Sequence, residues 1–425
     1  MAALRPCMRR VLVHRPLIRL ASTSSSTVSS TASTASTAST VSLSSTPADP
    51  PSTPSAPRHF LRISDLATWE LSQLIENTYR HKKNYQHEQW AMRDALHGKT
   101  VALMFSKLST RTRVSTEGAV VAMGGHPMFL GKNDIQLGVN ESLYDTSVVI
   151  SSMVSGIVAR VGPHSDIAEL AKHSSAPVIS GLCDTYHPLQ AIADFSTMAQ
   201  FASKGGKFPK DLRGLKIAWV GDANNVLHDL CVGAKKLGIQ VAIATPEGYG
   251  LSEKMRAEIH AAGPEGMLFE TNVPEEAVKG ADVILTDTWI SMGQEEEKVK
   301  RLKAFEGFTV TEELARRGGA AKDWKFMHCL PRHQEEVDDE VFYGNRSLVF
   351  PEAQNRLFAA IAAIECFIVN KGKVRRAPGI NRSRADRFYQ ANKRPANTQP
   401  KTASAWSSST PDGGEQETLA KEKKP

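Results

Sequence analysis

The chain has 425 residues, of which 41% are hydrophobic and 23% are charged, so it can form two or three domains with buried cores. This composition excludes a mini-scaffold and a wholly disordered chain, and no apolar run approaches the roughly 18 residues of a membrane-spanning helix. The net charge of +7 comes from the ends, because residues 1–57 carry +4, residues 371–425 carry +8 and residues 58–370 carry −5. We therefore expect neither a nucleic acid nor a membrane as partner of the globular part.

The first 57 residues have the composition of a targeting segment. All five of its arginines lie in the first 20 residues, and Ser/Thr/Ala repeats and a Pro-rich stretch follow. An Arg-rich, Ser-rich and acid-poor start is typical of an organelle transit peptide, whereas a secretory signal needs an uninterrupted apolar stretch. This predicts import into the mitochondrial matrix, with a merely disordered basic tail as the alternative.

The five cysteines include no CxxC pair, which argues against a disulfide framework or a zinc site.

Short apolar runs alternate with amphipathic segments through the middle of the chain. Strands buried on both faces are continuous apolar runs, and their alternation with helices is typical of parallel βαβ units. The predicted strands are residues 101–105, 156–161, 177–180, 216–220, 241–244, 283–286, 325–327 and 348–350. The pattern predicts an α/β fold with two domains, each a mainly parallel sheet with helices on both faces. The active site is expected in the cleft between the domains, at the carboxyl ends of strands.

The Gly- and Lys-rich segment around residues 204–209 predicts the domain boundary. The first domain then spans residues 58–205, joined by a returning helix at about 351–370, and the second spans residues 206–350. Residues 371–425 contain few large apolar side chains, which predicts a disordered basic tail because ordering it would bury too little surface. An RNA-binding or membrane-surface role is the alternative for this tail.

Hydroxyl and guanidinium side chains follow the first predicted strand directly, in the run Ser109-Thr110-Arg111-Thr112-Arg113. Ser109 or Thr110 can cap the helix that follows, which leaves backbone N–H groups, hydroxyls and guanidinium groups around one small volume. Such a volume is a cradle for phosphate. An ordinary capped helix with solvated arginines is the alternative interpretation.

The other candidate residues carry weaker signals when each is taken alone. A loop histidine such as His187 is more often a surface residue or a cap, but Arg160 is an unusual charge at the end of an apolar strand. The segment 221–225 lacks the G-x-G-x-x-G pattern of a dinucleotide site. Asp287 fits a helix cap equally well, and a thiol such as that of Cys329 is usually a small buried hydrophobe.

Taken together, five motifs resemble those of the aspartate and ornithine transcarbamoylase family. They occur in family order within about residues 59–370, and they are Ser109-Thr110-Arg111-Thr112-Arg113, Asp134-Ile135-Gln136-Leu137-Gly138, His187-Pro188-Leu189-Gln190, Asp287-Thr288-Trp289-Ile290-Ser291-Met292-Gly293 and His328-Cys329-Leu330-Pro331-Arg332. The last two motifs favour the branch that uses ornithine, which includes mitochondrial members. The long tail after residue 370 departs from the family pattern.

The resemblance implies transfer of the carbamoyl group from carbamoyl phosphate to the δ-amine of L-ornithine, giving L-citrulline and phosphate, without a metal or cofactor. The implied catalytic residues are Arg111, Arg160, His187 and Cys329. The implied carbamoyl-phosphate-binding residues are Ser109, Thr110, Arg111, Thr112, Gln136, Arg160, His187, Gln190, Cys329, Leu330 and Arg356. The implied ornithine-binding residues are Asn225, Asp287, Ser291 and Met292.

The resemblance also implies an assembly, because the family sends the loop that contains Gln136 into the neighbouring subunit's site. This predicts a homotrimer with shared active sites. Three rival functions remain open at this point: a transcarbamoylase that uses aspartate or an acetylated ornithine, a catalytically silent regulatory protein with the same fold, and nucleic-acid binding through the basic tails.

Overall fold

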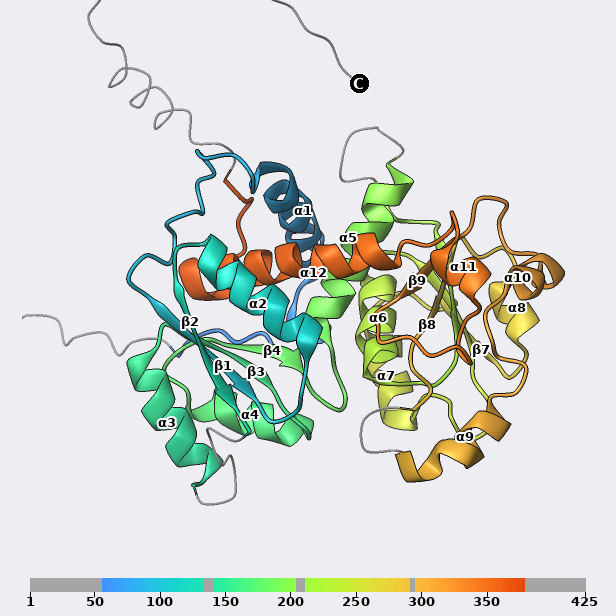
Figure 1. The fold of residues 1–425 in the computed structure, drawn as a ribbon, viewed down its shortest axis with the longest axis horizontal. Coiled ribbons are helices and arrows are strands. Elements are labelled where there is room, and N and C mark those ends of the chain that lie inside the picture. The colour runs from blue at the N-terminus through green and yellow to red at the C-terminus, as the bar shows by residue number, and fades with distance from the viewer. Residues whose placement is uncertain (1–55, 133–140, 204–210, 291–294, 379–425) are drawn as a thin grey trace, which may run out of the picture. The chain divides into compact units, whose positions relative to one another are not determined.

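The computed structural model describes residues 56–132, 141–203, 211–290 and 295–378 (Figure 1). These residues form two parallel sheets with helices on both faces, which confirms the predicted fold class. Among the described helices, none combines the length and the apolar character that a membrane crossing needs.

The first sheet has four parallel strands in the order β2-β1-β3-β4. The strands are β1 (Thr100–Phe105), β2 (His126–Gly131), β3 (Gly156–Arg160) and β4 (Val178–Leu182). Helix α2 (Thr110–Ala122) lies on one face, and α3 (Leu143–Met153) and α4 (His164–His173) lie on the other (Figure 1). Strand β1 is buried on both sides as a consequence, which explains its continuous apolar sequence.

The second sheet has five parallel strands in the order β7-β6-β5-β8-β9. The strands are β5 (Lys216–Val220), β6 (Gln240–Ala244), β7 (Leu268–Thr271), β8 (Val283–Thr286) and β9 (Lys325–His328). The helices that cover its two faces are, on one side, α6 (Asn225–Lys236) and α7 (Glu253–Ala261) and, on the other, α8 (Pro274–Val278) and α10 (Glu312–Gly318).

The last long helix, α12 (Val349–Ile364), returns to the helices of the first sheet. It packs against α1 (Thr68–Asn84), α2 and α5 (Pro188–Ala202). The remaining described helical segments are Ile63–Asp65, Glu295–Glu297, α9 (Lys298–Ala304), α11 (Asp339–Tyr343) and Glu365–Val369.

The structure also moves the start of the predicted tail. The side chain of Asn77, which is 1% exposed, donates to the backbone oxygen of Arg375 at 2.7 Å and accepts from the backbone N–H of Ala377 at 2.8 Å. The residues up to Pro378 therefore belong to the folded chain, since hydrogen bonds can anchor a segment that has few apolar side chains.

One predicted strand is wrong and two strands were not predicted. Residues 348–350 form the start of α12, with Leu348 as the N-cap residue, because an apolar run of three residues fits a strand and a first helical turn equally well. Strands β2 and β7 were missed because none of their residues is buried, unlike most of those of β4 and β9, so neither has the pattern of a strand buried on both faces.

Each sheet has one point where the strand order reverses, between β1 and β3 in the first sheet and between β5 and β8 in the second. Loops that follow such neighbouring strands leave in opposite directions, and the crevice between them is the usual ligand site of an open parallel sheet. Arg160 is the last residue of β3, and the segments after β1, β5 and β8 contain Arg111, Asn225 and Asp287. The topology therefore places the predicted site residues at both reversal points.

Candidate active site

The predicted phosphate cradle is formed where β1 passes into α2. Ser109 is the N-cap residue of α2, and its hydroxyl accepts from the backbone N–H of Thr112 at 3.3 Å. The Thr112 hydroxyl in turn accepts from Nη2 of Arg356 at 3.2 Å, so α12 contacts the cradle directly. Thr110, the first residue of α2, is exposed.

The two arginines of this motif face different surroundings. Arg111 donates from Nη2 to the backbone oxygen of Leu330 at 2.6 Å and so connects α2 to the loop after β9. Arg113 pairs instead with Glu117 at 3.0 Å, one turn along α2, and its guanidinium lies 3.5 Å from the ring centroid of Phe129. The two guanidinium groups of the motif therefore do not share the same surroundings.

Three guanidinium groups, those of Arg111, Arg160 and Arg356, share one electrostatic environment. Burial, reinforced by the charges of Arg356 and Arg111, lowers the pKa of Arg160 to about 10. Burial likewise lowers the pKa of Arg356 to about 10, and Arg111 contributes. The Nε atoms of Arg160 and Arg356 are buried and have no hydrogen-bond partner among the described residues. A buried cluster of cations with free donors is chemically suited to a multiply charged anion.

His187 lies beside this cluster as the N-cap residue of α5. Its backbone N–H donates to Oδ2 of the buried Asp229 at 2.8 Å, which ties the start of α5 to α6. Burial and the positive charges of Arg356, Arg160 and Arg111 hold the pKa of His187 well below its ordinary value. The imidazole is therefore neutral, and it can donate a hydrogen bond without first carrying a charge.

A second group of side chains follows the strands of the other sheet. Asp287, directly after β8, accepts from Nδ2 of Asn224 at 2.7 Å and from the thiol of Cys329 at 2.9 Å. Burial and the charge of Asp287 raise the pKa of the Cys329 thiol well above its ordinary value. Asn225, the first residue of α6, donates to the backbone oxygen of Cys183 at 2.6 Å. This group is acidic and amide-rich, in contrast to the guanidinium cluster.

Three predicted site residues lie outside the described part of the chain, namely Gln136, Ser291 and Met292. Gln190 joins the guanidinium cluster, since its side-chain oxygen accepts from Nη1 of Arg356, whereas Thr110 and Asn225 make no hydrogen bond to another predicted site residue in the described part of the chain.

Besides Asp229, sequence reasoning missed further residues whose side chains contact predicted site residues. Asn224 caps α6 and bonds to Asp287, while the buried carboxyl groups of Asp194 and Glu352 both accept from Gln190. Spacing offers a signal for the carboxyl groups. Asp194 follows Gln190 by four residues, and Glu352 precedes Arg356 by four, so each pair shares one face of its helix.

The side chains of Asp287, His328 and Cys329 could offer ligands to a metal ion, since one atom of each lies within 4.8 Å of the others. Both ring nitrogens of His328 are already used, however. Nδ1 accepts from the backbone N–H of Leu330 at 2.9 Å, and Nε2 lies 3.0 Å from Glu336. A metal would have to displace one of these contacts, so the donor set does not fit a metal centre.

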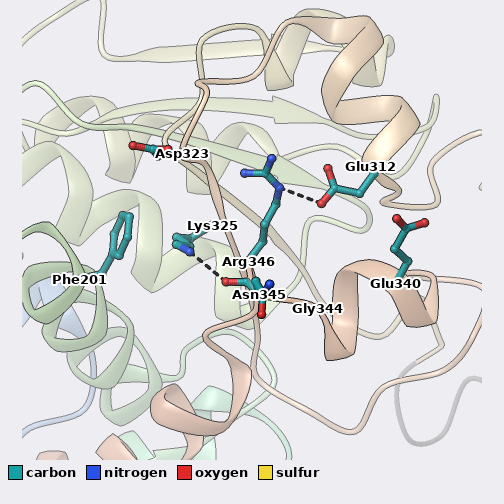
Figure 2. Close-up of a pocket in the computed structure, with 8 residues that line it drawn as sticks. All are labelled: Phe201, Glu312, Asp323, Lys325, Glu340, Gly344, Asn345 and Arg346. Carbon is teal, nitrogen blue, oxygen red and sulfur yellow. Dashed lines mark hydrogen bonds and ion pairs between the residues drawn. The ribbon is translucent and has the colours of Figure 1, made fainter.

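A separate hollow of about 600 Å³ lies elsewhere on the described chain and contains none of the predicted site residues (Figure 2). Both of its basic groups are already used, since Arg346 pairs with Glu312 at 2.8 Å and Lys325 donates to the backbone oxygen of Asn345 at 3.0 Å. The guanidinium cluster, in which the Nε donors of Arg160 and Arg356 have no partner among the described residues, is the better candidate for an anionic substrate.

Two family models match the chain. The model of the carbamoyl-P binding domain of aspartate/ornithine carbamoyltransferase matches residues 58–200, and that of its Asp/Orn binding domain matches residues 213–367. Mitochondrial ornithine carbamoyltransferases are similar over most of their length. The protein from Coccidioides immitis is 66% identical over 330 residues, which are 75% of this chain and 95% of the relative. The protein from Aspergillus niger is 63% identical over 327 residues, 75% of this chain and 88% of the relative.

Solved structures agree with these sequence matches. The crystal structure of a mitochondrial ornithine carbamoyltransferase from Coccidioides immitis matches with a TM-score of 0.69 and 62% identity, and the match covers 75% of this chain and 100% of that one. The ornithine carbamoyltransferase from Pyrococcus furiosus matches with a TM-score of 0.68 and 40% identity, over 74% of this chain and 97% of that one.

Proposed function

The chain belongs to the aspartate/ornithine carbamoyltransferase family, and we infer from this that it transfers the carbamoyl group of carbamoyl phosphate to the δ-amine of L-ornithine. The products are L-citrulline and phosphate, which makes the chain a transferase of the arginine-biosynthetic type (EC 2.1.3.3). The single observation that carries this assignment to the site is the cluster of Arg111, Arg160 and Arg356 beside a neutral His187, because these guanidinium groups have no acidic partner among the described residues.

The carbamoyl-phosphate half of the site follows from that cluster. The phosphate is held by the capped start of α2, with Ser109, Thr110 and Thr112, and by the guanidinium of Arg111. Arg160 and His187 donate to the carbonyl oxygen, Arg356 and Gln190 complete the carbamoyl site, and Leu330 offers its backbone oxygen. Gln136 is assigned to the same ligand from a neighbouring subunit.

The ornithine half uses the groups after β5, β8 and β9. Asp287 pairs with the α-ammonium, and Asn225, Ser291 and Met292 hold the α-amino-acid end. Cys329, which is 2.9 Å from Asp287, lies where the carbamoyl carbon and the δ-amine meet.

The proposed transfer then requires mainly that the two substrates are positioned and that the developing negative charge is stabilised. The neutral δ-amine attacks the carbonyl carbon and forms a C–N bond, and negative charge develops on the carbonyl oxygen next to Arg160 and His187. The C–O bond to phosphate breaks, the phosphate leaves with the bonding electrons, and it accepts the proton that the amine loses. Holding both substrates in one site can contribute about 7 to 11 kcal/mol to lowering the barrier.

A homotrimer with shared sites is supported by the exposed apolar surface around β2. This strand lies at the open edge of the first sheet, and its neighbours α2 and α3 expose large apolar side chains. The exposed residues are Val114, Val121, Met128, Tyr144, Val148, Val149 and Met153. Large apolar side chains exposed in this number on α2, β2 and α3 support a protein–protein interface there. Sedimentation measures the assembly, and mixed Gln136→Ala and Arg111→Ala subunits recover activity if sites are shared.

The chain acts in mitochondria, like the relatives described as mitochondrial, and we assign residues 1–57 to a matrix-targeting segment. Deleting this segment should abolish import and leave activity intact.

We also assign carbamoyl-phosphate binding to residues 58–205 and ornithine binding to residues 206–350. The helix at 351–370 is assigned to the first of these domains, which the packing of α12 against α1, α2 and α5 supports.

The test is product formation by the purified chain with carbamoyl phosphate and either ornithine or aspartate. Citrulline formation that disappears in Arg111→Ala supports the assignment. Formation of carbamoyl-aspartate alone would move the chain to the other branch of the family, and no product with either acceptor would favour a silent regulatory protein.

A further inference from the structure

A buried pair of carboxyl groups, connected to Arg356 through Gln190, has no role in the proposed reaction. Asp194 on α5 and Glu352 on α12 are each 1% exposed. Burial raises the pKa of both groups, and the charge of Asp194 raises the pKa of Glu352 further. Two neighbouring carboxyl groups in such a place do not both ionise, so the pair retains one proton.

Both carboxyl groups accept hydrogen bonds from one side-chain amide. Nε2 of Gln190 donates to Oδ1 of Asp194 at 2.7 Å and to Oε1 of Glu352 at 2.9 Å. On the other side of the amide, its oxygen accepts from Nη1 of Arg356. Both N–H groups of the amide are therefore used by the carboxyl pair, and the oxygen faces the guanidinium cluster.

These contacts fix which way the amide points. Rotating the Gln190 amide by half a turn would set its oxygen against two carboxyl oxygens and its NH2 group against the guanidinium donors of Arg356. All three hydrogen bonds would be lost, and the single proton of the carboxyl pair could supply only one in return. The carbonyl oxygen retains a second lone pair on the side of the cluster, since Arg356 uses only one.

We propose that Asp194 and Glu352 are positioning residues that make the site select a carbamoyl group over an acetyl group. The proposal depends on the function proposed above, because it places the carbamoyl group next to Gln190. A carbamoyl NH2 donates to the fixed oxygen of Gln190. The methyl group of an acetyl donor cannot, and it leaves the second lone pair of that buried oxygen without a donor, which is a basis for rejecting the analogue.

Acetyl phosphate is the matched probe, because it replaces the NH2 group by a methyl group and leaves the phosphate and carbonyl unchanged. We expect the unmodified enzyme to bind acetyl phosphate about 10-fold to 100-fold more weakly than carbamoyl phosphate. In Asp194→Asn the new amide can donate to Gln190 and favour the rotated orientation. Carbamoyl phosphate affinity should fall by a similar factor, while the affinities for acetyl phosphate and inorganic phosphate hardly change.

Glu352→Gln provides a second variant. It replaces the other carboxyl group that accepts from the Gln190 amide, and it should likewise reduce the ratio of carbamoyl phosphate affinity to acetyl phosphate affinity. Ser196→Ala is the control. It lies on α5, is buried, and loses a comparable 3.1 Å hydrogen bond from Gln200, but it has no hydrogen bond to Gln190. Its carbamoyl-to-acetyl affinity ratio should match that of the unmodified enzyme.

The carbamoyl-to-acetyl affinity ratio separates a positioning role from a general loss of structure. Partial unfolding would weaken the binding of carbamoyl phosphate, acetyl phosphate and inorganic phosphate together. A ratio that stays unchanged in both carboxyl variants, or that is absent in the unmodified enzyme, overturns the proposal. If the unmodified enzyme forms citrulline and only the ratio fails to change, the proposed function stands and the positioning role is wrong. If no citrulline forms, the proposed function itself fails.

Discussion

The two halves of the proposed site differ in how their charges are balanced before any substrate is present. In the carbamoyl-phosphate half, buried guanidinium groups repel one another and retain free donors. In the ornithine half, the carboxylate of Asp287 already accepts from Asn224 and Cys329. In the first half, an added anion supplies partners for the free donors. In the second half, Asp287 already has hydrogen-bond partners and must exchange them when a cation binds.

This difference has a consequence for binding. A dianion entering the first half gains free donors and relieves repulsion, and α2, α5 and α12 already hold those donors in place. Ornithine entering the second half has to replace contacts of Asp287 that exist without it. We therefore expect carbamoyl phosphate to bind well alone and ornithine to bind weakly without it, which calorimetric titration of each ligand can measure.

The strongest test of the ornithine half is Asp287→Asn, which keeps the shape and removes the charge. Loss of one partner of a desolvated ion pair costs about 2 to 5 kcal/mol, so kcat/KM for ornithine should fall by roughly 30-fold to several thousand-fold. The affinity for carbamoyl phosphate should hardly change. An unchanged kcat/KM for ornithine would contradict the assignment, and a parallel loss of both substrates would indicate a folding defect.

The carbamoyl-phosphate half is tested by Arg111→Ala, which should lower kcat by about 100-fold to 1,000-fold, as loss of one preorganised donor does. Arg111→Lys should recover only part of this loss, because an ammonium group does not reproduce the two-pronged contact of a guanidinium with phosphate. The matched control is Arg113→Ala, since Arg113 pairs with Glu117 outside the cradle. Full activity in the Lys variant would show that charge alone suffices.

The reactivity of Cys329 reports on the balance of charge in the ornithine half. Since Asp287 helps to raise the pKa of this thiol, Asp287→Asn should increase the thiolate fraction and speed alkylation about 10-fold, which corresponds to a pKa change of about one unit. Mass spectrometry of iodoacetamide-treated protein measures the rate at Cys329. The buried Cys231 serves as an internal reference. Equal rates in the two proteins would mean that Asp287 does not control the thiol.

The cationic surroundings of His187 predict a smaller, pH-dependent effect on stability. The folded-state pKa of His187 is depressed, so the unfolded chain binds the proton more readily, and stability is lost as the pH falls below about 6.5. His187→Gln should make this loss less steep, by at most about 1.4 kcal/mol per pH unit. Urea unfolding at several values between about pH 5 and pH 8, which bracket the ordinary histidine pKa of roughly 6.5, measures how steeply the free energy of unfolding changes with pH. A slope that is identical in both proteins would argue against a neutral, buried imidazole.

The smallest effect is expected outside the site, where it serves as a control for the comparison. Truncation after Gly372 removes the partners of the buried Asn77 side chain and should lower the free energy of unfolding by about 1 to 3 kcal/mol. Truncation after Pro378 keeps those partners and should cost less. Activity per folded molecule should be the same in both. Equal stability of the two truncated chains would show that the contacts of Arg375 and Ala377 contribute nothing.

The sequence predicted best what is encoded locally. The apolar run of β1 and the capped start of α2 lie next to each other in the chain, so the cradle around Ser109 and Arg111 could be located from their spacing. The different surroundings of Arg111 and Arg113 could not, because they depend on the loop after β9 and on β2. The carboxyl pair was missed for the same reason, since Asp194 and Glu352 are 158 positions apart and meet only when α12 returns to α5.

One measurement tests the central claim most directly, namely a competition in which ornithine and aspartate are present at equal concentration with limiting carbamoyl phosphate. The account predicts citrulline as the dominant product of the unmodified enzyme. It also predicts that Asp287→Asn reduces citrulline formation while carbamoyl phosphate affinity is retained. Carbamoyl-aspartate as the main product, or citrulline formation that does not depend on Asp287, would contradict the assignment of the two halves of the site.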